Sequence, residues 1–155
     1  MPTPYRDMDS LDLWLLKEAL AQAERGVSVE DELIPPQVAQ LGRSYVCLYA
    51  SAIFIGEVAN VGLSQFFENT SGALAPIVRD ALREMELSGY ADILAQIIDC
   101  FGDDYPHFQH IRSDRIDADP PLQEMLDRGS DAVDVWSDEF TSARKKFAEK
   151  CALIA

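Results

Sequence analysis

The sequence predicts an all-α protein, a single compact domain of about six to eight helices around a central apolar helix. Apolar residues recur at steps of three and four along most of the chain, and no segment shows the alternation typical of a strand. Prolines and glycines fall between these periodic segments, where they end helices. The 155 residues, 48 % of them hydrophobic, suffice for one substantial core, so residues 1–155 are expected to form one domain.

Two helices are predicted in the first part of the chain. The first follows Ser10, a residue type that caps helix N-termini, and it ends at Gly26. Its core face is predicted to carry Leu13, Leu16, Leu20 and Ala23. The second begins at Pro35–Pro36 and is the predicted central helix. Its core face is predicted to carry Leu41, Tyr45, Leu48, Ala52 and Ile55.

A helical hairpin is predicted next. Pro76 suits the first turn of one helix, and Ser88–Gly89 separates that helix from the following one. The apolar residues that define the two helices are Ile77, Ala81, Leu82 and Met85 in the first, and Tyr90, Leu94, Ile97 and Phe101 in the second.

The C-terminal third divides into two predicted segments. Residues 103–121 lack a period and contain five aspartates and three prolines, which predicts an irregular acidic surface segment. Residues 122–155 are predicted to form the C-terminal helices, a short one closed by Gly129 and a last one capped by Ser130. The core face of the last helix is predicted to carry Ala132, Trp136, Phe140, Ala143, Phe147 and Cys151.

The charge balance argues against some partners and favours others. The chain has 27 acidic and 13 basic residues, a net charge of −14, which opposes direct binding to nucleic acid or to an anionic membrane and suits a basic protein partner. The acidity is regional. Residues 92–139 contain 13 acidic residues against three arginines, a net charge of −10, whereas residues 140–155 carry a net charge of +3.

Nine aspartates are the predicted partner-binding residues. On the last predicted helix, acids three and four residues apart lie about 4.5 to 6 Å apart along the axis, at about 1.5 Å per residue. DNA presents a phosphate about every 3.4 Å on each strand, so such a row could imitate part of a phosphate track. The alternative is that these acids only favour the helix dipole and solubility. The nine residues are Asp103, Asp104, Asp114, Asp117, Asp119, Asp127, Asp131, Asp134 and Asp138, of which the last three share the predicted helix.

Residues 57–72 combine amides, a carboxylate and paired aromatics between two apolar helical runs. Turns are predicted at both ends of the stretch, with a short helix between them. The polar side chains predict a buried, mutually satisfied network that fixes how the helices meet. The alternative is a small cleft in which Glu57 binds a peptide or acts as a base. The motif residues are Glu57, Asn60, Gly62, Gln65, Phe66, Phe67, Asn69 and Gly72, and the polar network comprises Glu57, Asn60, Gln65 and Asn69.

Two features carry a resemblance to a known family: the run Glu57-x-x-Asn60-x-Gly62-x-x-Gln65-Phe66-Phe67-x-Asn69-x-x-Gly72, and the helix from Leu74 to Met85 that follows it. In both, the chain resembles the DNA-mimic protein family. The C-terminal domain of that family is also catalogued as a domain of unknown function. The resemblance covers residues 33–102. Where the family pattern has two adjacent glycines and then an aromatic, this chain has Val61, Gly62 and Leu63. The resemblance implies an all-helical, acidic homodimer that occupies the DNA-binding surface of a transcription regulator and relieves its repression.

Other kinds of site receive little support from the sequence. His107 and His110 follow two aspartates, but no third ligand at fixed spacing accompanies them, so no metal site and no cofactor are predicted. No phosphate-binding loop, dinucleotide fingerprint or serine elbow occurs, and no catalytic residue is predicted. Cys47, Cys100 and Cys151 are predicted to be reduced core thiols.

The longest apolar run, residues 46–55, is about half of a membrane span. The sequence shows no targeting leader, and a cytoplasmic location without membrane association is expected.

Three function hypotheses follow. The leading one is an acidic protein-binding module that uses the nine aspartates to occupy a basic surface on a partner such as a DNA-binding transcription regulator. The second is an antitoxin-like or immunity-like inhibitor, or a peptide-binding module, that uses the region from Glu57 to Gln65. The third, and least supported, is a small hydrolase or metal enzyme built on Glu57 or His107.

Overall fold

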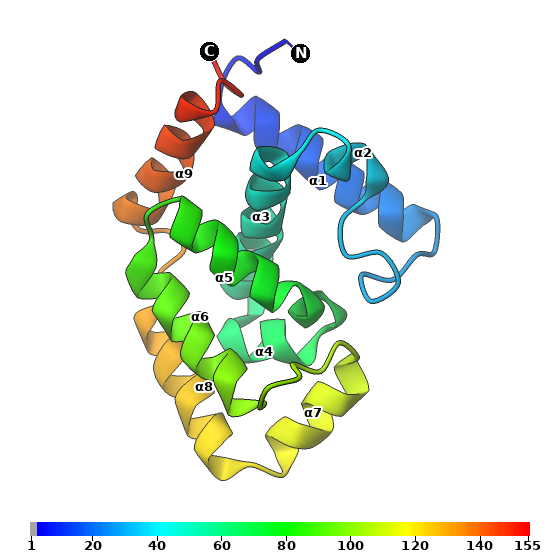
Figure 1. Cartoon of the computed structure of the whole chain (residues 1–155), viewed down its shortest axis with the longest axis vertical. Coiled ribbons are helices and arrows are strands. Elements are labelled where there is room, and N and C mark those ends of the chain that lie inside the picture. The colour runs from blue at the N-terminus through cyan, green and yellow to red at the C-terminus, as the bar shows by residue number, and fades with distance from the viewer. Residues whose placement is uncertain (1–2) are drawn as a thin grey trace.

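The computed structural model describes residues 3–155, and within them the protein is an all-α domain (Figure 1). Nine α-helices and one 3-10 helix follow one another in this range, and one isolated bridge pairs Tyr5 with Ile154. The predicted fold class is confirmed, although the helices are more numerous than expected. The elements are α1 (Met8–Glu24), α2 (Pro36–Ala39), α3 (Arg43–Val61), α4 (Leu63–Glu68), η1 (Thr70–Leu74), α5 (Ala75–Glu84), α6 (Ser88–Cys100), α7 (Gln109–Asp117), α8 (Pro120–Ala132) and α9 (Asp138–Lys150).

Helix α3 is the central helix, as predicted, and it packs against α1, α2, α4, α5 and α9. Tyr45, Leu48 and Phe54 are buried along it. By length and composition alone α3 is long and apolar enough to cross a membrane, with a mean hydropathy of 1.4. The helix begins at Arg43 rather than at the proline pair, because Gly42 has a φ of +100° and separates the short α2 from α3.

Helix α1 buries a different face from the predicted one. Leu11 and Leu15 are fully buried, whereas the exposed fractions of Leu13, Leu16 and Leu20 are 56 %, 47 % and 59 %. The helix has two leucine stripes, and its spacing alone does not decide which of them meets the core. The predicted cap is also displaced, because the side chain of Asp7, not that of Ser10, accepts a hydrogen bond at the N-terminus of the helix.

The predicted hairpin is confirmed by α5 and α6, which pack against each other (Figure 1). Leu82 on the first helix, Met85 at its C-cap, and Leu94 and Ile97 on the second helix are buried, as the spacing predicted.

Residues 103–121 are not the irregular segment that was predicted. Helix α7 occupies residues 109–117, and α8 already begins at Pro120. The two buried side chains of α7 are Arg112 and Ile116, so an arginine takes a place where the apolar period would have been recognised. Gly129 lies inside α8 rather than closing it, and a Cβ there would come within 2.7 Å of Leu63 Cδ2. This glycine therefore permits close packing of α8 on α4.

The last helix begins later than predicted. Helix α8 continues past Ser130 to Ala132, the chain is extended at Val133, and Ser137 caps α9 by accepting a hydrogen bond from Phe140 N at 3.2 Å. Trp136 consequently lies between the two helices and is 74 % exposed, where a core position was predicted.

The burial of α9 and of the cysteines agrees only in part with the prediction. Phe140 is fully buried as predicted. The three cysteines are free thiols, of which only Cys47 is fully buried, while Cys100 and Cys151 are partly exposed.

Candidate functional site

The predicted partner-binding aspartates are solvent-exposed with one exception. Asp119 is half-buried, because its carboxylate caps α8 and accepts a hydrogen bond from Leu122 N at 3.1 Å. Asp134 is exposed, and its Oδ1 accepts from Trp136 N at 3.0 Å. The other seven, all exposed, are Asp103, Asp104, Asp114, Asp117, Asp127, Asp131 and Asp138.

These acids are distributed over several elements. Asp131 lies near the end of α8, Asp134 lies in the connection, and Asp138 begins α9, so the prediction that these three share one helix is wrong. The reason is the extended backbone at Val133, which stops α8. Helices α7 and α8 pack against each other, as do α6 and α8, and Figure 1 shows α7 and α8 together at the lower end of the molecule.

Helix α8 carries a row of acids that differs from the predicted row. Glu124, Asp127 and Asp131 are three and four residues apart, and all three are exposed. Arg128 lies on the same side of the helix, with its Nη2 3.4 Å from Glu124 Oε1. Glu124 lies within the predicted short helix but was not among the predicted partner-binding residues, which were all aspartates. The row therefore combines three carboxylates with one guanidinium.

The polar residues of the 57–72 stretch do not form the buried network that was predicted. Asn69 Nδ2 donates to Glu57 Oε2 at 2.8 Å, and both residues are half-buried. Asn60 and Gln65 are exposed. Helix α3 continues through Asn60 to Val61, and α4 buries its two phenylalanines, so these two amides face solvent.

The two motif glycines have different roles. Gly62 has a φ of +89° and supplies the turn between α3 and α4, as predicted. Gly72 has no positive φ, contrary to the predicted turn, and instead permits a close approach. A Cβ on Gly72 would lie 2.7 Å from Phe66 O, 2.9 Å from Arg112 Nε and 2.9 Å from Phe67 O.

The missing side chain at Gly72 leaves room for Arg112, which is fully buried. Arg112 was not among the residues predicted from the sequence. Its guanidinium donates from Nε to Phe67 O at 2.9 Å and from Nη2 to Asn69 O at 2.7 Å. From Nη1 it donates to Pro106 O at 2.8 Å and to His107 O at 2.6 Å. We call this set of four carbonyls the Arg112 cage. Burial is the largest influence on the pKa of Arg112 and lowers it.

Tyr105 closes the Arg112 cage. Its ring centroid lies 5.9 Å from the guanidinium carbon, and its hydroxyl donates to Gly72 O at 2.7 Å. Burial raises the pKa of the Tyr105 phenol, so the phenol remains protonated and can keep donating. The cage therefore fixes α7 to the 57–72 stretch.

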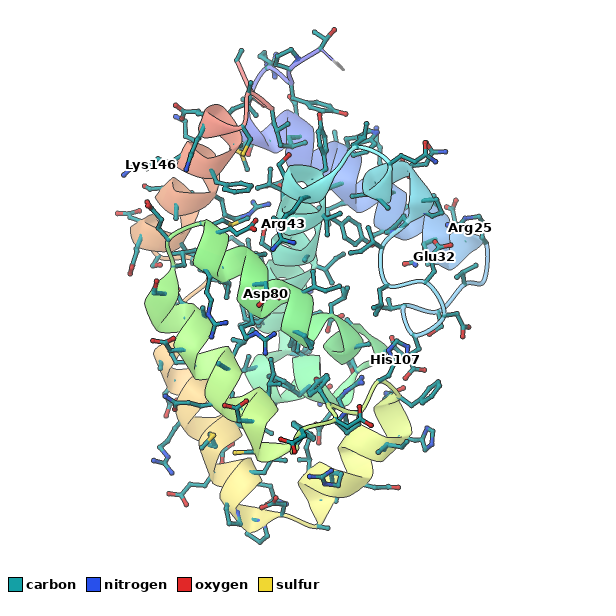
Figure 2. All side chains as sticks on the ribbon, viewed as in Figure 1. Arg25, Glu32, Arg43, Asp80, His107 and Lys146 are labelled. Atoms are coloured by element: carbon teal, nitrogen blue, oxygen red, sulfur yellow. The ribbon has the colours of Figure 1, made fainter. Side chains whose placement is uncertain are left out.

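The two histidines differ in their surroundings. His107 Nε2 is hydrogen-bonded to Glu30 O, and Figure 2 shows the ring beside the loop that precedes α2. His110 is exposed. Within residues 3–155, no three histidine, cysteine or acidic side chains lie close enough to hold a metal ion together.

Glu57 lies between two hollows of the surface. One is a groove of about 320 Å³ between α1 and the end of α3, and its lining includes Leu16, Ile53, Glu57, Asn60 and Val61. The other is a cavity of about 250 Å³ on the side of η1. The predicted choice between a buried network and a cleft thus resolves into a half-buried Glu57–Asn69 pair with hollows on both sides.

A protein-family model described as DMP19-like protein matches residues 39–154. The matched range begins six residues later than the predicted resemblance over residues 33–102 but extends 52 residues further toward the C-terminus. It contains the 57–72 stretch, the Arg112 cage and the acidic helices α7 and α8. No curated protein and no solved structure matches the chain.

Proposed function

Because the chain belongs to the DMP19-like family of DNA-mimic proteins, we propose that it is an acidic binding protein that occupies the basic DNA-binding surface of a partner, such as a transcription regulator. The observation that carries the proposal is the exposure of the carboxylates on α7 and α8 in a chain whose net charge is −14. Such a distribution attracts a basic surface over a distance and repels DNA itself. The proposed role is binding without catalysis.

Three of these carboxylates are suited to a direct test. Asp114, Asp127 and Asp131 are exposed, and within residues 3–155 their side chains form no ion pair and no hydrogen bond. Neutralising them therefore removes surface charge without removing a helix cap. Asp119 and Asp134 are less suitable because their side chains hold backbone amides.

The test measures binding to a regulator that the immobilised chain retains from native cell lysate at low salt. The triple variant Asp114→Asn, Asp127→Asn and Asp131→Asn should bind at least about tenfold more weakly, because long-range attraction is lost, and added salt should narrow the difference. The retained regulator should also be displaced by its own DNA.

A matched variant controls for net charge. Asp9→Asn, Glu24→Gln and Asp31→Asn remove the same amount of charge from exposed positions on α1 and on the loop that follows it. The proposal expects this variant to bind like the wild type. Equal weakening in both variants, or binding that ignores DNA and salt, would contradict occupation of a DNA-binding surface by the α7–α8 acids.

A second candidate function is a peptide-binding or inhibitor module that uses the groove beside Glu57. Its support is the exposed apolar pair Leu16 and Val61 on either side of that groove. Gln65 is exposed on the next helix but does not line the groove, whereas Asn60 is exposed and lines it. An Asn60→Lys variant should weaken partner binding if the groove is used, and should leave it unchanged if the α7–α8 acids are used.

We also propose that the protein forms a homodimer and is located in the cytoplasm. The exposed stripe of Leu13, Leu16 and Leu20 on α1 supports self-association, because apolar side chains favour burial against a second copy. Sedimentation equilibrium of a variant with all three changed to serine should show a larger monomer fraction than the wild type. An unchanged monomer fraction would place any dimer contact elsewhere.

A further inference from the structure

Trp136 was predicted to lie in the core, but its side chain is 74 % exposed, more than any other large hydrophobic side chain of residues 3–155. Tryptophan is a highly buried residue type on average, and its ring carries one of the largest apolar surfaces of any side chain. Exposure of this degree leaves an aromatic face without a partner in the described part of the chain.

A short turn fixes the position of Trp136. The chain is extended at Val133, and both Val133 and Val135 are buried. The alternate residues, Asp134 and Trp136, are exposed. Ser137 N donates to Asp134 O at 3.2 Å, and Trp136 N donates to Asp134 Oδ1 at 3.0 Å. The backbone and the side chain of Asp134 therefore close the same turn, and the indole lies on its outer side.

Tyr90 of α6 attaches this turn to the rest of the molecule. Its hydroxyl donates to Asp134 O at 3.4 Å and lies 3.2 Å from Ser137 Oγ. Its ring meets the ring of the buried Phe140 edge-on, with the two centroids 5.5 Å apart. The connection between α8 and α9, which Figure 1 shows, thus presents Trp136 on a fixed backbone. A side chain presented in this way loses little conformational entropy when a partner binds it.

The surroundings of Trp136 are acidic. Asp134 and Asp138 each lie two residues from it, which places their Cα atoms within roughly 7 Å of its own. Residues 129–143 contain four acids and no lysine, arginine or histidine. Among the ion pairs of residues 3–155, none involves these four acids. In the same range Asp134 Oδ2 has no hydrogen-bond partner, so this oxygen is available to a donor from outside the chain.

An aromatic face next to unpaired carboxylates suits a cation, and its chemistry favours one kind of cation. Tryptophan attracts a cation above its ring more strongly than the other aromatic side chains do. A guanidinium is planar and weakly hydrated, so it stacks on such a ring while the N–H groups at its edge donate to carboxylates. The ammonium of lysine is compact and strongly hydrated, and it gains less from the ring. Tryptophan and arginine are also enriched among the hot spots of protein interfaces.

We propose that Trp136 is a docking point for an arginine side chain of the basic partner. The guanidinium stacks on the indole and donates to the carboxylate of Asp134 or Asp138. This inference rests on the proposed function in taking a basic protein as the partner, and it adds the side chain that is recognised. Charge at a distance attracts arginine and lysine alike, so the choice between basic surfaces falls to Trp136.

The test compares two fluorescein-labelled peptides of equal charge, hexa-arginine and hexa-lysine, in anisotropy titrations with the full chain. The wild type should bind hexa-arginine more tightly, and Trp136→Ala should lower the ratio of the two affinities at least about threefold, the strength of one exposed cation–π contact. Trp136→Phe should keep part of the ratio. The chain has two tryptophans, so the indole N–H signal that Trp136→Ala removes from the NMR spectrum belongs to Trp136. In the wild type that signal should shift and saturate with hexa-arginine, whereas the signal of Trp14, which packs between Tyr5 and Tyr45, should stay.

Two control variants separate the indole from its surroundings. Leu20→Ala removes an exposed apolar side chain of α1 and should leave both affinities unchanged. Asp131→Asn removes one of the four acids and should weaken both peptides by the same factor, because the peptides carry the same charge. A wild-type affinity ratio in a folded Trp136→Ala variant, an equal loss of the ratio in Leu20→Ala, or a Trp136 indole signal that ignores hexa-arginine would each overturn the proposal. No regulator takes part in this experiment, so its failure is distinguishable from failure of the triple-aspartate test of the proposed function.

Discussion

Two buried arginines attach the later helices to the core, and they are satisfied in different ways. Arg144 of α9 donates from Nη1 and Nη2 to the two carboxylate oxygens of Asp12, both at 2.8 Å, and from Nε to Ser51 Oγ at 2.9 Å. Arg112 of α7 has no carboxylate in its cage and donates to four backbone carbonyls. One charge is neutralised by a counterion, and the other is dispersed among backbone dipoles.

The difference determines what each site requires of the rest of the chain. Arg144 requires an acid at one position, on a helix 132 residues away. Arg112 requires only carbonyls, which every residue has, but it requires them at a fixed backbone geometry with room left at Gly72. The Arg112 cage lies entirely within the family-matched range, whereas Asp12 lies outside it. The cage is therefore a property of the backbone, and the Arg144–Asp12 pair is a property of two side chains.

Removing Arg112 should have the largest effect. Arg112→Ala leaves a void and removes the guanidinium from four carbonyls, of which Asn69 O still accepts from Gly72 N, so the free energy of unfolding should fall by about 4 kcal/mol. Arg112→Lys keeps the charge but not the planar fork of donors, and it should lose about 2 kcal/mol. Urea unfolding followed by circular dichroism measures both. A loss below about 1 kcal/mol for the alanine variant would show that the cage contributes little to stability.

Gly72→Ala should be next, because it perturbs the Arg112 cage through the backbone alone. The new methyl group would overlap Phe66 O and Phe67 O, which cannot rotate away, and a loss of about 3 kcal/mol is expected. Gly56→Ala is the matched control. It lies inside α3, and a methyl group added there would have no atom within 4 Å, so it should stabilise the fold by about 0.5–1 kcal/mol. Equal effects of the two variants in urea unfolding would contradict the close-approach role of Gly72.

Arg112 and Gly72 also show how much of the fold could be predicted from the sequence alone. The central position of α3, though not its start, and the α5–α6 hairpin were predicted correctly, because apolar residues at steps of three and four define their core faces. Helix α7 was missed because its core face consists of Arg112 and Ile116, which give no apolar period. A buried arginine whose partners are carbonyls has no signature in residue types. The close approach at Gly72 likewise depends on tertiary packing.

The candidate site, too, could be predicted from the sequence only in part. Carboxylates at solvent-facing positions follow from residue type and from the cost of burying a charge, so exposure of most of the nine aspartates could be predicted. Their assignment to helices could not, because the end of α8 at Val133 has neither a glycine nor a proline to mark it. In the 57–72 stretch, Asn69 does bind Glu57, but the facing of Asn60 and Gln65 was decided by how α3 and α4 pack.

The counterion side of the comparison is tested by Asp12→Asn. The guanidinium of Arg144 keeps the Ser51 hydroxyl and the Leu48 carbonyl but loses its neutralising charge. Because Asp12 is 27 % exposed and water can partly replace it, the expected loss is about 2 kcal/mol, less than for the Arg112→Ala variant. Asp9→Asn on the same helix is exposed and should change stability by less than about 0.5 kcal/mol. A double variant with Gly72→Ala should be additive in urea unfolding, since the two arginine sites share no partner.

The smallest effect is expected at Asp7, which begins the helix that carries Asp12. A hydrogen bond from the backbone N–H of Ser10, the largest influence, lowers the pKa of Asp7 from 3.8 to about 2. A pKa that is lower in the folded state gives a contribution to stability that is complete above pH 3.8 and is lost as the pH falls to about 2. Asp7→Asn retains a capping side chain but cannot titrate. Wild type should therefore exceed Asp7→Asn in urea midpoint at about pH 5, and the difference should vanish toward about pH 2. A difference that stays constant across this range would show that the Asp7 carboxylate does not make the stability of α1 depend on pH. Helix α1 is the helix that carries Asp12, the counterion of Arg144.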